Sequence, residues 1–238
     1  MSSGIALPHW SDLVLWYLAF LMSIVAHESA HAWAALKLGD HTAHAEGLVT
    51  LDPVPHLRRE PFGAVVVPLL SYVLGGWMIG WASTPYSRVW AQRAPKAAAL
   101  MALAGPLANL GLVILAALLI RVGILFDYFR PPSKIGFSMV VTAPGGGVPE
   151  GLAMLLSILF TINLILLVFN LLPLPPMDGS AILPLVLSHD AALRYRNLVQ
   201  NSSLSFLGLF LAWKFFGEVF SPLHLMAIKL LYPGLGYH

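Results

Sequence analysis

The stretch "AHESAHAWAAL", residues 26–36, places two histidines and a glutamate within an apolar segment, preceded by "LVLWYLAFLMSIV" at residues 13–25 and followed by Lys37 and Leu38. On a helix, positions i and i+4 lie almost above one another, so His27 and His31 present two imidazoles to one point with Glu28 beside them. This H-E-x-x-H spacing is typical of zinc sites in which the glutamate is the general base. A charged residue within a transmembrane helix costs about 2.5–3.5 kcal/mol. Packing alone does not require three polar groups at ligand spacing, so we favour a metal site over a hydrogen-bonded packing cluster.

The composition indicates a polytopic helical membrane protein. Of 238 residues, 58% are hydrophobic and 10% are charged, whereas soluble domains contain about 25% charged residues. The net charge of +2 and the lack of basic clusters with interleaved aromatics argue against nucleic acid as a partner. The chain has no cysteine, so any metal must be held by nitrogen and oxygen ligands.

The apolar segments predict an all-α membrane fold in a single domain, residues 1–238, with a core at 11–188 and a C-terminal helix and surface tail at 189–238. Four helices are expected, at about 11–38, 97–120, 151–172 and 204–220. Segment 62–82 is interrupted by Pro68 and by Gly75-Gly76, which predicts a bent or re-entrant segment. The short stretch "GLVTL", residues 47–51, suggests a small membrane-associated β element.

A catalytic zinc ion has three protein ligands and one open position, and the third ligand lies outside the first helix. Asp178 is the best candidate because "NLLPLPPMDGSAILPLVL", residues 170–187, is apolar on both sides of it. Asp52, Asp127 and Asp190 lie in polar stretches, where a solvated carboxylate needs no metal. Capping of the following short helix is the alternative role for Asp178. The histidine pair makes ligation the preferred interpretation.

Three landmarks together resemble the site-2 protease family of intramembrane zinc metalloproteases. These are "HESAH" at 27–31, "AGPLAN" at 104–109 and "NLLPLPPMDG" at 170–179. The resemblance implies one Zn²⁺ per chain on His27, His31 and Asp178, with Glu28 activating the zinc-bound water and Asn109 assisting near the scissile carbonyl. "GWASTPY" at 80–86 resembles a segment that runs as an edge strand beside the site in small family members. We find no PDZ or CBS domain, as expected for a minimal form.

The position of the histidines constrains the topology. His27 lies about 24 Å along the first helix at 1.5 Å per residue, near the C-terminal end of that helix, and Asp178 follows the C-terminal end of the third. Both can reach one ion only if these two helices are parallel, so segment 62–82 should not cross fully. Basic residues then favour a site facing the cytoplasm. They are Lys37, Arg58, Arg59, Arg88, Arg93, Lys96, Arg194 and Arg196, against Arg121, Arg130 and Lys134 on the other side. We expect the membrane to be the cytoplasmic membrane of a prokaryote.

The sequence therefore predicts an intramembrane zinc endopeptidase that cleaves peptide bonds in or near transmembrane segments, with a transmembrane substrate and the lipid bilayer as partners. Two alternatives remain at this point. One is a membrane-embedded metal transporter, and the other is a membrane-anchored peptidase that acts on soluble peptides. The sequence leaves open the substrate, the oligomeric state and the roles of His44, His56 and Asn170.

Overall fold

The computed structural model describes residues 10–199 and 202–237 as a helical protein. Residues 1–9 of the predicted domain therefore lie outside the described part. The elements in chain order are α1 (Trp10–Lys37), α2 (Thr42–Ala45), α3 (Pro53–Arg59), the π-helical η1 (Phe62–Val66), α4 (Val67–Gly75), α5 (Arg88–Arg93), α6 (Pro95–Leu125), α7 (Val148–Leu171), α8 (Asp178–Ile182), the 3₁₀ turn η2 (Leu183–Leu185), α9 (His189–Val199) and α10 (Ser202–Leu231).

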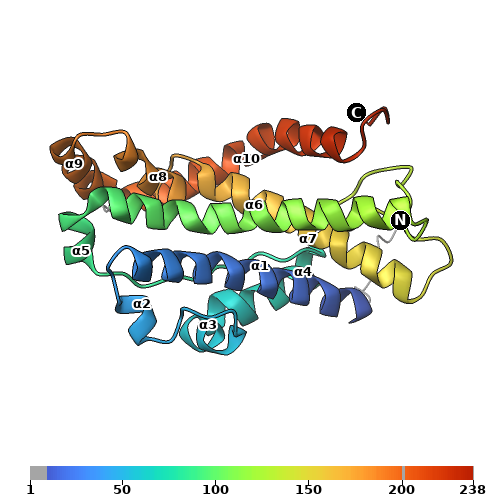
Figure 1. Ribbon diagram of the computed structural model, residues 1–238, viewed down its shortest axis with the longest axis horizontal. Coiled ribbons are helices and arrows are strands. Elements are labelled where there is room, and N and C mark those ends of the chain that lie inside the picture. The colour runs from blue at the N-terminus through green and yellow to red at the C-terminus, as the bar shows by residue number, and fades with distance from the viewer. Residues whose placement is uncertain (1–9, 200–201, 238) are drawn as a thin grey trace.

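Within the described residues, four helices are long and apolar enough to cross a membrane, namely α1, α6, α7 and α10. Helices α1 and α7 run in the same direction, as Figure 1 shows. Helix α6, which comes between them in the chain, runs antiparallel to both. The predicted parallel arrangement of the first and third spans is thus confirmed. The C-terminal end of α1, together with α2, α5, α8 and α9, forms one end of the molecule.

Segment 62–82 forms no helix of spanning length. Its helical part covers Phe62–Gly75, which at 1.5 Å per residue reaches about 21 Å, short of a hydrocarbon core of about 30 Å. The helix begins with the π-helical turns of η1 and ends at Gly76, whose φ of 74° is left-handed. This interruption agrees with the predicted bent segment.

Two expectations need correction. No strand occurs in the described residues, and 47–51 forms bends after α2 rather than a β element, because no second segment lies alongside to complete a ladder. Likewise, α10 continues through Pro222 to Leu231, so residues 221–231 belong to a long helix and not to a surface tail.

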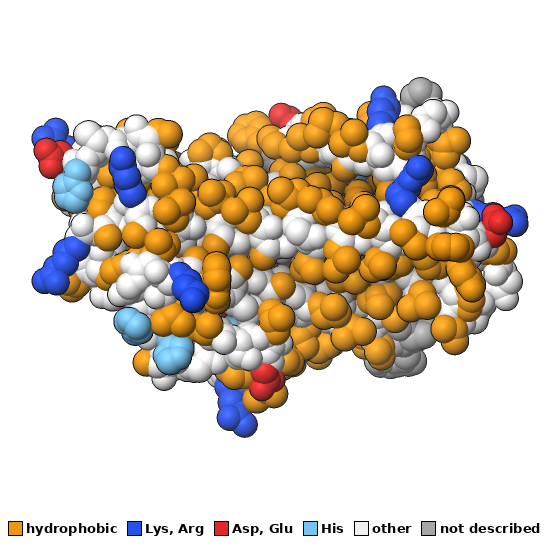
Figure 2. All heavy atoms as spheres, in the orientation of Figure 1, with side chains coloured by type: hydrophobic (Ala, Val, Ile, Leu, Met, Phe, Trp, Pro, Cys, Tyr) orange, Lys and Arg blue, Asp and Glu red, His pale blue; other side chains and the backbone are white. Residues whose placement is uncertain are grey.

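Hydrophobic side chains cover the middle of the face seen in Figure 2, and charged side chains lie mainly toward its two ends and lower edge. Inside, one apolar cluster joins α1 and α4 to α7 through buried residues such as Phe20, Tyr72 and Ile158. A second joins α6, α7 and α10 around Ile120 and Phe160. The exposed apolar middle and the polar ends are what a bilayer requires of a spanning protein.

An extended segment, residues 77–87, passes from α4 to α5 alongside α1, as Figure 1 shows. Trp81 N–H donates to the Gly63 carbonyl at 3.0 Å. A Cβ at Gly80 would lie 2.4 Å from the same carbonyl, so a glycine is needed for this close approach. At the far end of the segment, Ser87 N–H donates to Asp40 Oδ2 at 2.7 Å. Asp40 therefore fixes the extended segment to the end of α1.

Replacing Asp40 by asparagine should destabilise the protein by about 1–2 kcal/mol at neutral pH, because a charge-assisted hydrogen bond is lost. Burial opposes ionisation of Asp40, but hydrogen bonds from Thr42 and Ser87 outweigh it and hold the pKa below its usual value. A lowered folded-state pKa stabilises the fold above the ordinary value of about 3.9, and this contribution is lost as pH falls through the folded-state value. Thermal unfolding in detergent from about pH 6 to about pH 3 should show the Asp40→Asn deficit shrinking. A deficit that stays constant over this range would contradict the assignment.

Candidate metal centre

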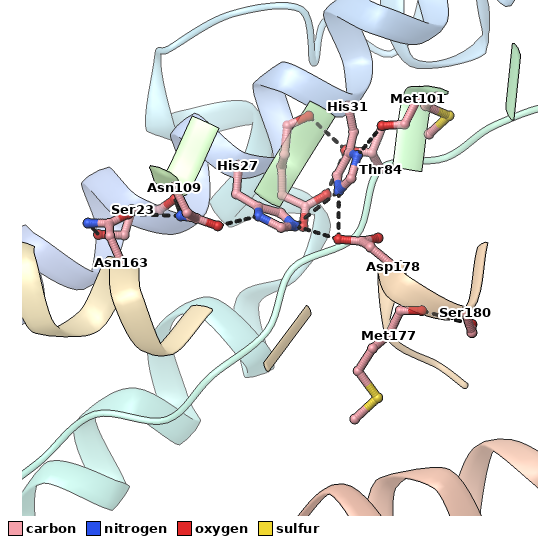
Figure 3. A network of polar contacts seen from close by, with 11 residues as sticks. Ser23, His27, His31, Thr84, Met101, Asn109, Asn163, Met177, Asp178 and Ser180 are labelled. Carbon is pink, nitrogen blue, oxygen red and sulfur yellow. Dashed lines mark hydrogen bonds and ion pairs between the residues drawn. The ribbon is translucent and has the colours of Figure 1, made fainter. Parts of the chain in front are cut away.

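Three side chains from two distant parts of the chain converge at one point. His27 Nε2 and His31 Nε2 lie 3.0 Å apart, and Asp178 Oδ2 lies 3.2 Å from the first and 3.3 Å from the second. The histidines come from α1, and Asp178 begins α8 immediately after the proline-rich turn that ends α7. Figure 3 shows the three side chains pointing toward one another.

The hydrogen bonds of the imidazoles leave both Nε2 atoms free for a cation. His27 Nδ1 lies 2.6 Å from Asn109 Oδ1, and His31 Nδ1 lies 2.8 Å from the Met101 carbonyl. Both partners are acceptors, so both Nδ1 atoms carry the proton and the Nε2 lone pairs face each other. Two lone pairs and a carboxylate at this spacing repel unless a cation lies between them.

The donor set fits zinc. Ligands at about 2.0–2.1 Å in a tetrahedral site lie roughly 3.2–3.5 Å apart, close to the three separations found here. Asp178 Oδ2 is buried without a hydrogen-bond partner, as expected of an atom reserved for a metal.

A chain of buried amides lies behind His27, on the side away from Asp178. Asn109 Nδ2 donates to Asn163 Oδ1 at 2.8 Å, and Asn163 Nδ2 donates to Ser23 Oγ at 2.8 Å, as seen in Figure 3. Asn109 and Asn163 are fully buried, and neither lines the cavity beside the centre. The family resemblance implied that Asn109 assists near the scissile carbonyl, but its contacts favour a positioning role through His27. Asn163 and Ser23 were not singled out from the sequence, although a polar residue within "FTINLILLVFN" is an available signal.

Glu28 is held by the extended segment. Thr84 Oγ1 lies 2.6 Å from Glu28 Oε2 and 2.9 Å from the Glu28 carbonyl. The hydroxyl donates its one proton to these acceptors, so the carboxylate is oriented by a residue 56 positions away in sequence. The second carboxylate oxygen remains available for a proton from a reactant.

A cavity of about 400 Å³ opens beside the three converging atoms. His27, Glu28, His31 and Asp178 all line it, together with Thr84 and Asn170 from the extended segment and the end of α7. The volume lies within the range of ordinary ligand pockets, about 300–1,000 Å³. A peptide segment therefore has room to reach the candidate metal position.

The other residues considered from the sequence lie elsewhere. His56 is buried, and its Nε2 lies 3.0 Å from the Thr50 carbonyl, which anchors the loop after α1. His44 is exposed. Asp52 caps α3 by accepting a hydrogen bond from Val54 N–H at 3.0 Å.

Gly105 in α6 leaves the space that the two imidazoles occupy. A Cβ at this position would lie 2.3 Å from His31 Nε2 and 2.6 Å from His27 Nε2. Because α6 packs closely on α1, such a Cβ would have to push the imidazole rings of His27 and His31 out of place. The glycine of "AGPLAN" is thus explained by the approach of a helix backbone to the histidine pair.

Gly105→Ala should weaken zinc binding at least about tenfold, comparable to disturbing an outer partner of a ligand. Helical content should be unchanged, because alanine favours a helix. Zinc affinity is measured by competition with a chelator and helicity by circular dichroism. Gly111→Ala on the same helix is the matched control, since a Cβ there meets nothing within 4 Å. Equal zinc affinity in the two variants would contradict the steric argument.

Fold and site together define a class: a helical membrane protein in which two histidines and one carboxylate converge as a candidate metal centre beside a glutamate. The family model "Peptidase family M50" matches residues 15–211. The chain therefore belongs to this family, the site-2 proteases, which are zinc metalloproteases.

Curated relatives agree with this membership. The chain is 34% identical over 167 residues to "Putative zinc metalloprotease YwhC" of Bacillus subtilis (strain 168), covering 70% of this chain and 66% of the relative. It is 32% identical over 208 residues to "Putative zinc metalloprotease Rip2" of Mycobacterium tuberculosis (strain ATCC 25618 / H37Rv), covering 84% of this chain and 70% of the relative. The match thus spans slightly less than two thirds of YwhC. No solved structure matches the chain significantly.

Proposed function

We propose that this protein is an intramembrane endopeptidase, with zinc held by His27, His31 and Asp178 and with Glu28 as general base. The observation that carries the proposal is the convergence of three ligand atoms within 4.8 Å of one another. The two histidines belong to a candidate membrane span. A hydrolytic centre at this location acts on peptide bonds in or near a membrane-spanning segment.

Glu28 accepts the proton of the attacking water and delivers it to the leaving nitrogen, which avoids expelling an amide anion. Thr84 keeps the Glu28 carboxylate turned toward the reactants. Asn109 holds the His27 ring so that Nε2 faces the centre. Zinc, when bound, supplies Lewis acidity that polarises the scissile carbonyl and lowers the pKa of water.

The extended segment is suited to hold the substrate. Within the described residues, the backbone of 82–86 makes no hydrogen bond to other backbone, and Ala82, Ser83 and Thr84 line the cavity. A substrate unwound from its helix can pair with this edge as an added strand. Unwinding is required because helical carbonyls are already hydrogen-bonded and shielded from attack.

The test compares a single-span membrane substrate with a soluble peptide of the same central sequence, using zinc-loaded protein in liposomes. Cleavage of the spanning substrate at a rate at least about tenfold higher supports the proposal. Preference for the soluble peptide would indicate a membrane-anchored peptidase. Zinc flux without cleavage of either substrate would indicate a transporter.

We also propose that the centre faces the cytoplasm, because the basic residues of α5 and α9 lie at the end of the molecule that holds it, as Figure 1 indicates. The chain has no cysteine, so single cysteines report orientation directly. Gln92→Cys in α5 should react with an impermeant thiol reagent only after cells are opened. Ser133→Cys, exposed in the loop between α6 and α7, should react in intact cells. The reverse pattern would overturn this orientation.

A further inference from the structure

Arg196 is a buried cation that the proposed chemistry does not use. It lies on α9, is 8% exposed, and lines the same cavity as Glu28 and Asp178. Its Nη1 donates to the Ala91 carbonyl at 2.5 Å. No carboxylate of the described residues lies within ion-pair distance of the guanidinium.

A buried charge is unfavourable unless it is paired. One neutral carbonyl uses one of the five N–H donors of a guanidinium, and no other described partner is present for the rest. If Arg196 served only to attach α9 to α5 through the Ala91 carbonyl, a side chain with a neutral N–H or O–H donor would suffice. The remaining donors are not among the buried atoms without a partner, so they reach the cavity and offer a position for an anion that arrives from it.

The charges of the cavity support the same conclusion. One bound Zn²⁺ would balance the two carboxylates of Glu28 and Asp178, which would leave Arg196 as the excess positive charge among the residues that line the cavity. A guanidinium binds a carboxylate through two parallel hydrogen bonds, which fixes both position and orientation. A peptide that carries a carboxylate would thus bind more tightly and would also be held at a defined position in the cavity.

We propose that Arg196 is a specificity-determining residue that binds a carboxylate of the peptide substrate, supplied by an acidic side chain near the scissile bond or by a free C-terminus. This inference rests on the proposed endopeptidase function. It sets where a substrate is held relative to the metal centre. Val199 and Ser205, which line the cavity from α9 and α10, lie on the same side and are not charged.

The experiment measures peptide binding with cleavage disabled. Zinc-loaded Glu28→Gln protein in detergent is titrated with fluorescent single-span peptides carrying one glutamate scanned through the central positions, each with a glutamine twin. Short peptides with a free or an amidated C-terminus form the second arm. The same titrations are repeated with Arg196→Gln and Arg196→Lys added. Arg194→Gln, an exposed residue of the same helix, is the matched control.

The expected result is that one glutamate position, or the free C-terminus, tightens binding by at least about tenfold over its neutral twin. Arg196→Gln should abolish that difference while leaving the neutral twin within about twofold, and Arg196→Lys should keep part of it. The arm that shows the difference identifies the source of the carboxylate. Equal weakening of acidic and neutral peptides, or no preference for any carboxylate, would overturn the proposal.

Binding and cleavage separate this inference from the one on which it rests. The acidic peptide that binds best is then offered to the protein with Glu28 restored. Carboxylate-selective binding without cleavage would contradict the proposed endopeptidase function but would still support carboxylate binding by Arg196. Cleavage of acidic and neutral peptides at equal rates would support the endopeptidase function and would contradict the proposed role of Arg196.

Discussion

Replacing Glu28 by glutamine should lower the rate of substrate cleavage by about 10²–10⁴-fold, the usual contribution of a general base. Glutamine preserves the size of the side chain and can still accept the hydrogen bond that Thr84 Oγ1 donates to Glu28 Oε2 at 2.6 Å. It cannot take a proton from water. The folded structure and the metal ligands remain in place, so the bound zinc should stay at one ion per chain.

The measurement pairs initial cleavage rates with zinc content by mass spectrometry on the same samples. Glu150→Gln is the control, because Glu150 is exposed in the first turn of α7 at the far end of the molecule. If Glu28→Gln retained most of the wild-type rate with zinc present, the proton-transfer role would be refuted. Loss of zinc in this variant would instead make Glu28 a ligand.

Asp178→Ala should remove zinc almost completely under dialysis against a weak chelator. The carboxylate oxygen lies 3.2 Å and 3.3 Å from the two Nε2 atoms, and alanine leaves two ligands where a catalytic site needs three. The loss in affinity should exceed the roughly 10–100-fold expected from removing an outer partner of a ligand. Cleavage should fall with it.

Zinc affinity by chelator competition measures the effect, and Asp190→Ala at the exposed start of α9 is the control. Helical content should be retained, since Met177 and not Asp178 occupies the N-cap position of α8 and Asp178 Oδ2 has no hydrogen-bond partner. This observation also argues against the capping role considered from the sequence. Unchanged zinc affinity in Asp178→Ala would refute the proposed ligand set.

The membrane class, the histidine pair and the position of Asp178 followed from sequence because each depends on local rules. Helical spacing places His27 and His31 together, and the cost of a carboxylate in apolar surroundings singles out Glu28 and Asp178. The parallel arrangement of α1 and α7 followed from the same residues. The expected β element failed because a strand needs a partner that lies elsewhere in the chain, and no local pattern reports its absence.

By itself, then, the sequence determined the helical membrane fold, the segment that fails to span and the three residues proposed to hold zinc. Only the tertiary structure decided which groups support them: Asn109 and Asn163 behind His27, Thr84 on Glu28, and Arg196 in the cavity wall. The physical reason is that periodicity and burial cost act along the chain, between near neighbours. Hydrogen-bond partners depend on atoms brought within about 3 Å by folding, from positions whose separation in sequence carries no signal.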